Sequence, residues 1–184
     1  MIRAGVPATL FPFETPRATL RRLTRDDGAG VHAYMSDADV TRWLPEGELS
    51  VAAAQTFVDA NMGDDARAFA AVAKADERLI GHFVLHPWGD EKNRTFEIGW
   101  VLARGAQGQG FATEVGTKVL ALTFEKLGAQ RIIATCQPEN TASARVAEKL
   151  GMRCEGRFRR CIYRGEDIWW DELFFAVLRD EHVG

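Results

Sequence analysis

Several hallmarks of other protein classes are missing from this 184-residue sequence. Three cysteines (Cys136, Cys154 and Cys161) are too few for a disulfide framework, and they lack the spacing of metal ligands. No apolar run approaches the roughly 20 residues that a membrane span needs, and the N-terminus has no apolar core with a cleavage site. The sequence therefore predicts a cytoplasmic protein in a reducing compartment, with neither a membrane segment nor a metal site.

An excess of positive charge is missing as well. The net charge of -3 argues against a nucleic-acid surface and is compatible with a cationic substrate. Hydrophobic residues make up 46% of the chain and charged residues 27%, which is typical of a globular protein. The sequence contains neither a repeat nor a linker, so we expect one domain over residues 1–184. Its first 16 residues are expected to form an irregular lead-in.

A glycine-rich turn at residues 107–114 is the main candidate for a ligand site. A strand-like apolar run at 96–102 precedes it, and a helix-like run follows with Val115, Val119 and Leu122 at helical spacing. Glycines at a strand-to-helix turn let the main chain approach a ligand closely. The first N–H groups of a helix lack partners and lie at the positive end of its dipole, so such a turn binds phosphate.

The spacing within this turn excludes two common phosphate motifs. The dinucleotide fingerprint requires a third glycine where Thr113 stands, and the nucleotide P-loop requires a lysine that is missing here. Residues 107–112 instead match Gln/Arg-x-x-Gly-x-Gly/Ala at every fixed position. This hexapeptide resembles the pyrophosphate-binding loop of the GNAT acetyl-coenzyme A N-acetyltransferases. A plain glycine turn before a surface helix is the alternative.

A second stretch, residues 140–152, strengthens the resemblance. It is similar to the GNAT pattern Asn-x-x-Ser/Ala followed by a helix ending in Glu-Lys-Leu-Gly-Phe/Met. Together with residues 16–21 and 36–40, it resembles the branch that acetylates ribosomal-protein N-termini. The resemblance covers about residues 16–178, so two motifs in the right order support each other.

Apolar periodicity and turn residues divide the chain into alternating strands and helices. Mixed strands with helices between them predict a three-layer α/β (α+β) domain. The resemblance implies a central mixed, mostly antiparallel sheet that is splayed at the cofactor site. The expected strands are 19–23, 69–73, 79–88, 96–102, 131–136 and the closing hairpin of 158–163 with 169–177, and the expected helices start near residues 26, 37, 50, 111 and 140.

The resemblance implies acetyl-coenzyme A as cosubstrate. Its pantetheine arm would pair with the amides of Val101 and Leu102, and Asn140 would reach the same arm unless it only caps its helix. Arg145 would meet coenzyme phosphate, whereas Lys149 is expected to be a solvated charge, and Glu114 should point away from the phosphate. Main-chain N–H groups would hold the diphosphate at Gln107, Gly108, Gln109, Gly110, Ala112 and Thr113.

Glu97 and Ser143 are the candidate catalytic residues. Glu97 lies on the strand beside the expected thioester and could act as general base, or it could be paired with Arg94 or another base. Many GNAT enzymes carry a tyrosine acid seven residues after the asparagine, but Ala147 stands there. Ser143 is therefore the candidate that protonates the leaving thiolate, unless it is only a first-turn hydroxyl.

Other reactive side chains have weaker support. Tyr163 is a backup acid that is better explained by packing, and Cys136 lacks the His/Asp pattern of an acyl-enzyme nucleophile. His82 and His86 share a strand face but have no third metal ligand.

The expected function is transfer of an acetyl group to a primary amine, either a peptide or protein N-terminal α-amine or a small amine. The alternatives are an acyl-coenzyme A sensor without turnover and a scaffold that keeps only the fold. The acceptor would bind between the N-terminal helices and the closing hairpin, and a homodimer is compatible with the sequence. Trp43, Trp88, Trp169 and Trp170 could line that acceptor pocket.

Overall fold

The computed structural model describes residues 6–182. One eight-stranded sheet has the order β1-β2-β3-β4-β5-β6-β8-β7, and β5 with β6 is the parallel pair within it. The other neighbouring strands run antiparallel. The strands are β1 (Phe13–Glu14), β2 (Ala18–Arg22), β3 (Ala68–Ala73), β4 (Leu79–Pro87), β5 (Thr95–Leu102), β6 (Arg131–Cys136), β7 (Arg153–Tyr163) and β8 (Trp169–Leu178).

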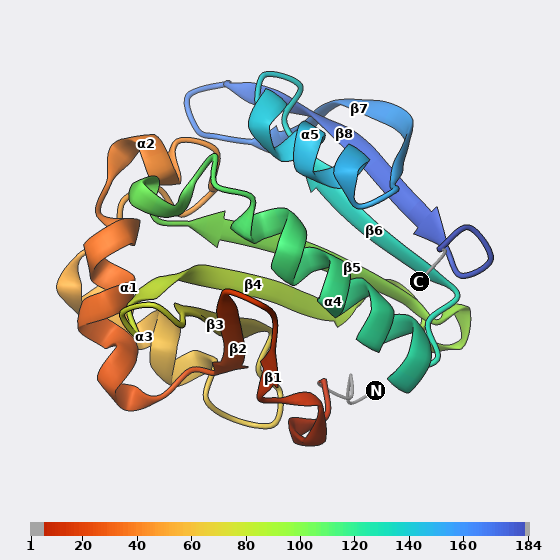
Figure 1. The fold of residues 1–184 in the computed structure, drawn as a ribbon. Coiled ribbons are helices and arrows are strands. Elements are labelled where there is room, and N and C mark those ends of the chain that lie inside the picture. Colours follow the sequence, from red (N-terminus) through yellow and green to blue (C-terminus); the bar gives the residue numbers. More distant parts are fainter. Residues whose placement is uncertain (1–5, 183–184) are drawn as a thin grey trace.

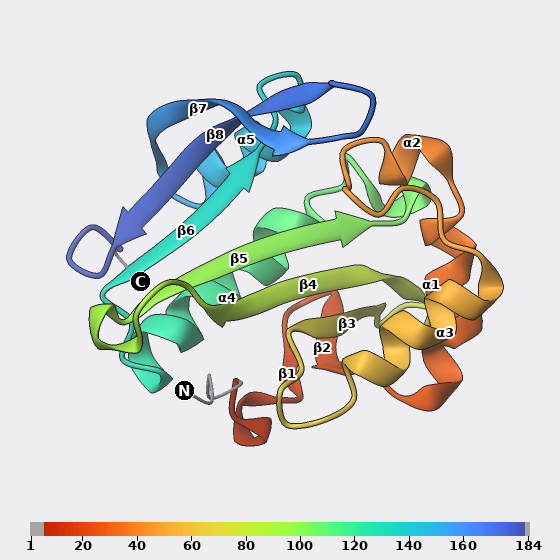
Figure 2. The ribbon, with the colours of Figure 1, turned by 180° about the vertical axis from the view of Figure 1, so that it is seen from behind.

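Helices cover both faces of the sheet. One face carries α4 and α5, and the opposite face carries α1 and α3 (Figures 1 and 2). A separate buried cluster forms the core under each layer. This arrangement confirms the predicted three-layer α/β fold. The α-helices are α1 (Gly28–Met35), α2 (Ala38–Thr41), α3 (Val51–Ala60), α4 (Phe111–Lys126) and α5 (Thr141–Lys149), and the 3-10 turns are η1 (Ala8–Leu10), η2 (Arg25–Asp27), η3 (Glu91–Asn93) and η4 (Arg104–Ala106).

The sheet opens between β5 and β6. These strands are paired only at their beginnings, and the last pair joins Glu97 to Ile133. Beyond that pair β6 continues against β8, and β5 continues against β4, so the two halves of the sheet separate (Figure 1). The predicted splaying is therefore confirmed.

Local sequence explains where α4 and its neighbours begin and end. Val115, Val119 and Leu120 of α4 are at most 2% exposed and pack against the sheet. Burying each such side chain contributes about 1.5–3 kcal/mol. Ser50 caps α3 by accepting a hydrogen bond from the N–H of Ala53, as its position predicts. Gly151 has φ +79° and ends α5.

Two expectations at the ends of the domain are wrong. The lead-in at residues 1–16 is not wholly irregular, because it contains η1 and β1, and β1 pairs with β2. The first strand of the closing hairpin begins at Arg153 rather than at residue 158, because its first residues pair with β8 across a bulge. Residues 1–5 of the lead-in lie outside the described part.

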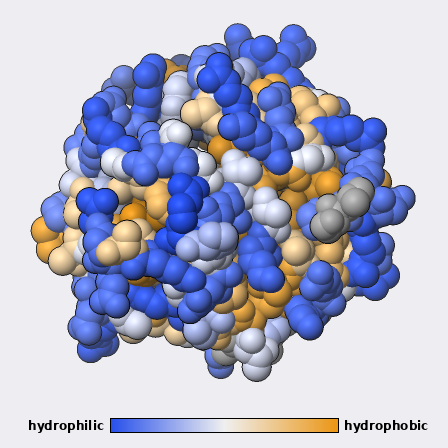
Figure 3. Space-filling model, in the orientation of Figure 1, coloured by the Kyte–Doolittle hydropathy of each residue, from blue (hydrophilic) through white to orange (hydrophobic). Residues whose placement is uncertain are grey.

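The surface over α4 is mostly hydrophilic, with apolar residues showing between the polar ones (Figure 3). Among residues 6–182, no helix is both long and apolar enough to cross a membrane.

Candidate active site

A cavity of about 380 Å³ lies where β5 and β6 separate. The end of β5, the loop before α4 and the N-termini of both α4 and α5 line it, together with α2 and the residues that follow α2. The structure thus brings together the two sequence motifs that are about 30 residues apart in the chain. The site residues predicted from the sequence that line the cavity are Val101, Leu102, Gln107, Gly108, Gly110, Ala112, Thr113, Asn140, Ser143 and Arg145.

Two predicted site residues do not line the cavity. The carbonyl of Gln109 accepts a hydrogen bond from Arg17 on the outside of the loop. Glu97 lies at the last β5–β6 pair, where the strands part, rather than on the cavity wall. Lys149 is exposed and borders the cavity beside Arg145.

The glycine loop has the geometry of an anion site. Gly108 has φ +72° and Gly110 has φ +85°, a region that L side chains rarely adopt. Gly110 caps α4, and no side-chain cap hydrogen bond is made there. The first N–H groups of a 16-residue helix therefore remain available at the positive end of its dipole. This end of α4 faces the cavity.

The direction of the β5 main chain differs from the expectation for Val101. The N–H of Ala103 donates to the carbonyl of Ile80 on β4 at 2.8 Å. Residues of an antiparallel strand alternate in direction, so the main-chain groups of Val101 also face β4. Trp100 and Leu102 face the open side instead. The carbonyl of Leu102 accepts a hydrogen bond from the side chain of Gln107 at 2.9 Å, which leaves its N–H facing the cavity.

The second motif forms the start of α5. The side-chain oxygen of Asn140 accepts a hydrogen bond from the N–H of Ser143 at 3.2 Å, so Asn140 is a helix cap that also lines the cavity. Ala147, at the position where many GNAT enzymes carry a tyrosine, is 1% exposed and packs in the core. Tyr163 is 59% exposed and packs against Trp169, away from the cavity.

Glu97 lies in an environment that favours its neutral form. Burial raises the pKa of this carboxyl group, the nearby His86 opposes the rise, and Glu172 adds to it. The basic partner is His86, with 3.7 Å between its Nε2 and Oε2 of Glu97, and not Arg94. A partly buried carboxyl with a raised pKa is suited to proton transfer near neutral pH.

Cys136 is unsuited to nucleophilic catalysis. Burial raises the pKa of its thiol to about 11, although a hydrogen bond with Ser143 opposes the rise. The thiol is therefore protonated at neutral pH, whereas the thiolate is the nucleophile. Among the described residues, no group of three or more His, Cys, Asp or Glu side chains could hold a metal ion.

Sequence reasoning proposed Trp43 for the acceptor pocket but did not identify the rest of the wall that α2 and the residues after it contribute to the cavity. Asp39, Val40, Trp43 and Leu44 line it, and Trp43 packs edge-on against Trp170 of β8. Among the four tryptophans proposed for the acceptor pocket, Trp43 lines this cavity, whereas Trp88 packs against Phe174. Such contacts join residues that are far apart in the sequence, so a local sequence pattern does not predict them.

Comparisons with known proteins agree with this geometry. The acetyltransferase (GNAT) domain family matches residues 17–153. The uncharacterized N-acetyltransferase YnaD of Bacillus subtilis (strain 168) is 41% identical over 167 residues, which cover 91% of this chain and 96% of that relative. The crystal structure of a GNAT-family acetyltransferase from Bacillus anthracis is similar with a TM-score of 0.87 and 40% identity, covering 92% of this chain and 99% of that one.

A more distant structure shares the fold alone. The spermidine N-acetyltransferase from Vibrio cholerae, solved in complex with CoA and spermine, has a TM-score of 0.76 at 22% identity. It covers 89% of this chain and 96% of its own. The family match spans most of the described chain, and the relatives align over nearly their whole length. The chain is therefore an acetyl-transferring enzyme and belongs to the GNAT acetyltransferase family.

Proposed function

We propose that this enzyme transfers the acetyl group of acetyl-coenzyme A to a primary amine by direct attack on the thioester. The observation that carries the proposal is the cavity at the β5–β6 opening, which collects the glycine loop and the N-terminus of α5. It joins an anion site to an open strand edge, and the coenzyme needs both.

The coenzyme fits this cavity in one direction. The diphosphate would accept hydrogen bonds from the main-chain N–H groups of the glycine loop from Gly108 onward and of the first turn of α4. The N–H of Gln107, which was also predicted from the sequence, already donates to the carbonyl of Arg104. The pantetheine arm would run back along β5 and pair with the main-chain groups of Trp100 and with the N–H of Leu102, whose carbonyl already accepts from Gln107, as a strand added to a sheet edge. Val101 would contact the arm without pairing with it. Arg145 and Lys149 at the cavity border supply positive charge for the phosphates.

Running back along β5, the arm would bring its thioester toward the point where the strands part, near Glu97. The amine attacks the thioester carbonyl, and a tetrahedral oxyanion forms. We assign Glu97 as the general base that takes the proton of the amine, directly or through water, because its raised pKa suits this transfer.

Collapse of this intermediate releases the coenzyme thiolate. Ser143 lines the cavity at the start of α5 and is the hydroxyl that we assign to protonating the thiolate, with its own proton replaced at once from solvent water. A covalent intermediate on Cys136 is disfavoured because that thiol has a pKa of about 11.

The acceptor is a primary amine of one of two kinds. The resemblance to ribosomal-protein N-terminal acetyltransferases favours a peptide α-amine, and the spermidine N-acetyltransferase with the same fold favours a small amine. An α-amine with a pKa of about 8 is roughly one-tenth neutral at pH 7, whereas an amine near 10.4 is neutral in well under one part in a thousand. Glu97 is therefore a sufficient general base for an α-amine, whereas a more basic amine would need additional help to lose its proton.

Release of free thiol from acetyl-coenzyme A across a panel of peptides, polyamines and lysine derivatives tests this function. We expect amine-dependent release that requires acetyl-coenzyme A and is strongly reduced in the Glu97→Gln variant. Stoichiometric binding of the coenzyme with no thiol release for any amine would instead support an acyl-coenzyme A sensor.

A further inference from the structure

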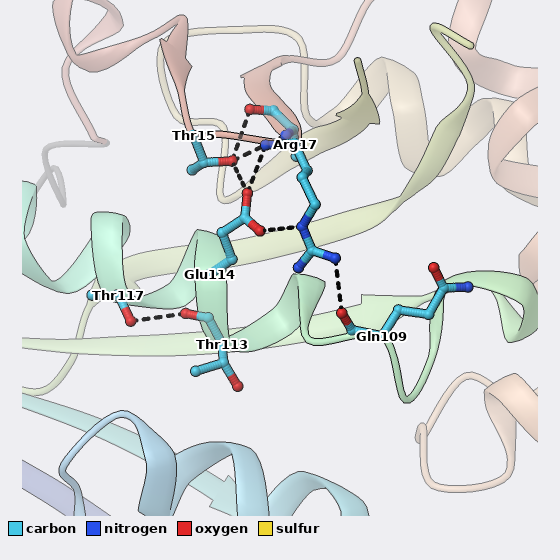
Figure 4. Close-up of polar contacts among 7 residues, drawn as sticks. Thr15, Arg17, Gln109, Thr113, Glu114 and Thr117 are labelled. Carbon is cyan, nitrogen blue, oxygen red and sulfur yellow. Dashed lines mark hydrogen bonds and ion pairs between the residues drawn. The ribbon is translucent and has the colours of Figure 1, made fainter. Parts of the chain in front are cut away.

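The turn between β1 and β2 is bound to the outside of the glycine loop (Figure 4). Arg17 Nη1 donates a hydrogen bond to the carbonyl of Gln109 at 3.0 Å, and Arg17 Nε donates to Oε2 of Glu114 at 2.6 Å. The guanidinium also lies 4.5 Å from the centre of the Phe111 ring. One side chain therefore contacts the loop, the first residue of α4 and a carboxylate in the first turn.

Both carboxylate oxygens of Glu114 accept hydrogen bonds on the side of α4 that faces away from the cavity. Its Oε1 accepts hydrogen bonds from the Thr15 hydroxyl at 2.7 Å and from the Arg17 main-chain N–H at 2.8 Å. Burial raises the pKa of this carboxyl, but the hydrogen bonds from Thr15 and Arg17 outweigh it and lower the pKa overall. Glu114 is thus ionised and points away from the cavity, as the sequence predicts.

The bond to Gln109 also sets the direction of the next amide. A planar trans peptide holds its C=O and the following N–H on opposite sides. Because the Gln109 carbonyl points out toward Arg17, the N–H of Gly110 points to the opposite side, where Gly110 lines the cavity. A Cβ built on Gly110 would lie 3.4 Å from Arg17 Nη2, so the guanidinium packs directly against this residue.

We propose that Arg17 is a positioning residue for the coenzyme diphosphate, with Glu114 as its orienting partner. This inference rests on the proposed use of acetyl-coenzyme A. Arg17 aims the Gly110 amide into the cavity, and it neutralises a carboxylate that would otherwise oppose an anion at the start of α4. It acts through the loop and does not touch the substrate.

If the Arg17–Glu114 ion pair only stabilised the fold, loss of Arg17 would lower the stability and would affect all ligands alike. The Arg17 side chain is 48% exposed, and Glu114, which is 16% exposed, keeps its hydrogen bonds from the Thr15 hydroxyl and the Arg17 main-chain N–H when the guanidinium is lost, so the change in folding stability should be small. Loss of Arg17 should therefore change the coenzyme affinity far more than it changes the stability. The effect should also be confined to ligands that carry the diphosphate.

The Arg17→Met variant tests this, because methionine keeps much of the aliphatic stem and loses every hydrogen bond. We expect the Kd of coenzyme A, measured by calorimetry, to rise about tenfold, in line with one lost charge-assisted hydrogen bond. The kcat/KM for acetyl-coenzyme A should fall by a similar factor. The kcat/KM for S-acetylpantetheine, which has no diphosphate, should stay unchanged. Arg78→Met is the matched control, since Arg78 forms an exposed pair with Asp76 away from the loop.

The Glu114→Gln change should affect the affinity for coenzyme A in opposite directions in the presence and absence of Arg17. In the Arg17→Met background the carboxylate has lost its counter-charge, so Glu114→Gln should partly restore the affinity for coenzyme A. In the wild-type background the same change should weaken the affinity, because Arg17 loses the group that orients it.

Three results would overturn the proposal. They are a wild-type Kd in Arg17→Met, an equal loss with coenzyme A and S-acetylpantetheine, and a further loss when Glu114→Gln is added to Arg17→Met. A wild-type protein that binds no coenzyme A would overturn the proposed function as well, so the two failures are distinguishable.

Discussion

At the residue scale, Glu97 combines a raised pKa with a place at the parting of β5 and β6. Below its pKa the carboxyl is protonated and cannot accept a proton, and the acceptor amine is also protonated there. We predict that log kcat/KM rises with a slope near 2 at low pH and near 1 above the pKa of Glu97, with the break above about 4.3, the ordinary value for glutamate. The measurement is a pH profile of thiol release.

Glu97→Gln is the matched variant for this profile. It should lower kcat/KM by a factor on the order of 10²–10⁴ and give a slope near 1 throughout, because only the amine then titrates. A variant that keeps both the rate and the break in slope would exclude Glu97 as the base.

His82 is a second residue whose pKa links structure to pH. Burial lowers the pKa of His82 to about 4, and its Nδ1 lies 2.7 Å from the Tyr34 hydroxyl. In the unfolded chain the His82 imidazole is protonated below about pH 6.5, whereas in the folded protein it stays neutral down to about pH 4. The free energy of unfolding is therefore unaffected by His82 protonation above about pH 6.5. It declines by on the order of 3 kcal/mol as the pH falls from there toward 4, because the unfolded chain then binds the proton more tightly.

Urea unfolding of wild type and His82→Gln between pH 7.5 and 5 measures this linkage. The free energy of unfolding of the wild type should fall more steeply with decreasing pH than that of His82→Gln, although the variant is less stable at pH 7.5. Parallel pH dependences would assign the decline to other groups.

At the element scale, β4 controls the position of the strand that borders the cavity. Gly81 in β4 has φ +149°, and a Cβ there would lie 2.1 Å from the carbonyl oxygen of Val101. We predict that Gly81→Ala pushes the end of β5 out of place, because the contact is with main chain that cannot rotate away. It should reduce the free energy of unfolding by roughly 1–3 kcal/mol, the range of overpacked core sites, and weaken coenzyme binding.

Gly156 in β7 provides the control, since nothing lies within 4 Å of a Cβ placed there. Gly156→Ala should leave both stability and coenzyme affinity close to wild type. Chemical denaturation and calorimetry compare the two alanine variants, and equal stability of both would contradict the proposed contact.

Elements with strong local patterns were predictable from the sequence. β6 spans Arg131–Cys136, as its β-branched run indicates, and Ser50 caps α3 as its position indicates. The glycine loop was predictable because the positive φ angles of Gly108 and Gly110 require residues without a Cβ.

Contacts that depend on the sheet register were not predictable in this way. The direction of the Val101 main chain follows from its pairing with β4, and a local apolar pattern does not reveal which residues face which neighbour. The ion pair of Arg17 with Glu114 joins residues 97 positions apart, and His86 meets Glu97 only across two paired strands. The catalytic environment therefore required the fold, whereas the cofactor loop did not.

At the scale of the whole molecule, segments far apart in the chain are held around the cavity by arginines. Arg104, just before the glycine loop, forms ion pairs with Asp37 and Asp39 at α2. Arg164, in the β7–β8 turn, donates to the carbonyl of Leu44 at 2.7 Å and stacks on Trp170. With Arg17 at the β1–β2 turn, three arginines fix the surroundings of one site, so coenzyme binding should be coupled to the stability of the whole domain.

Thermal unfolding measures this coupling. Coenzyme A at 100 times its Kd should add about 2.7 kcal/mol to the stability of the folded state. For a domain of this size, that corresponds to a rise in Tm of about 5–10 °C. At the same concentration, a tenfold weaker Kd in Arg17→Met removes about 1.4 kcal/mol, so its Tm should rise by roughly half as much. Pantetheine lacks the diphosphate and should give wild type and Arg17→Met the same small shift. Equal coenzyme A shifts in the two proteins would mean that the glycine loop holds its shape without Arg17.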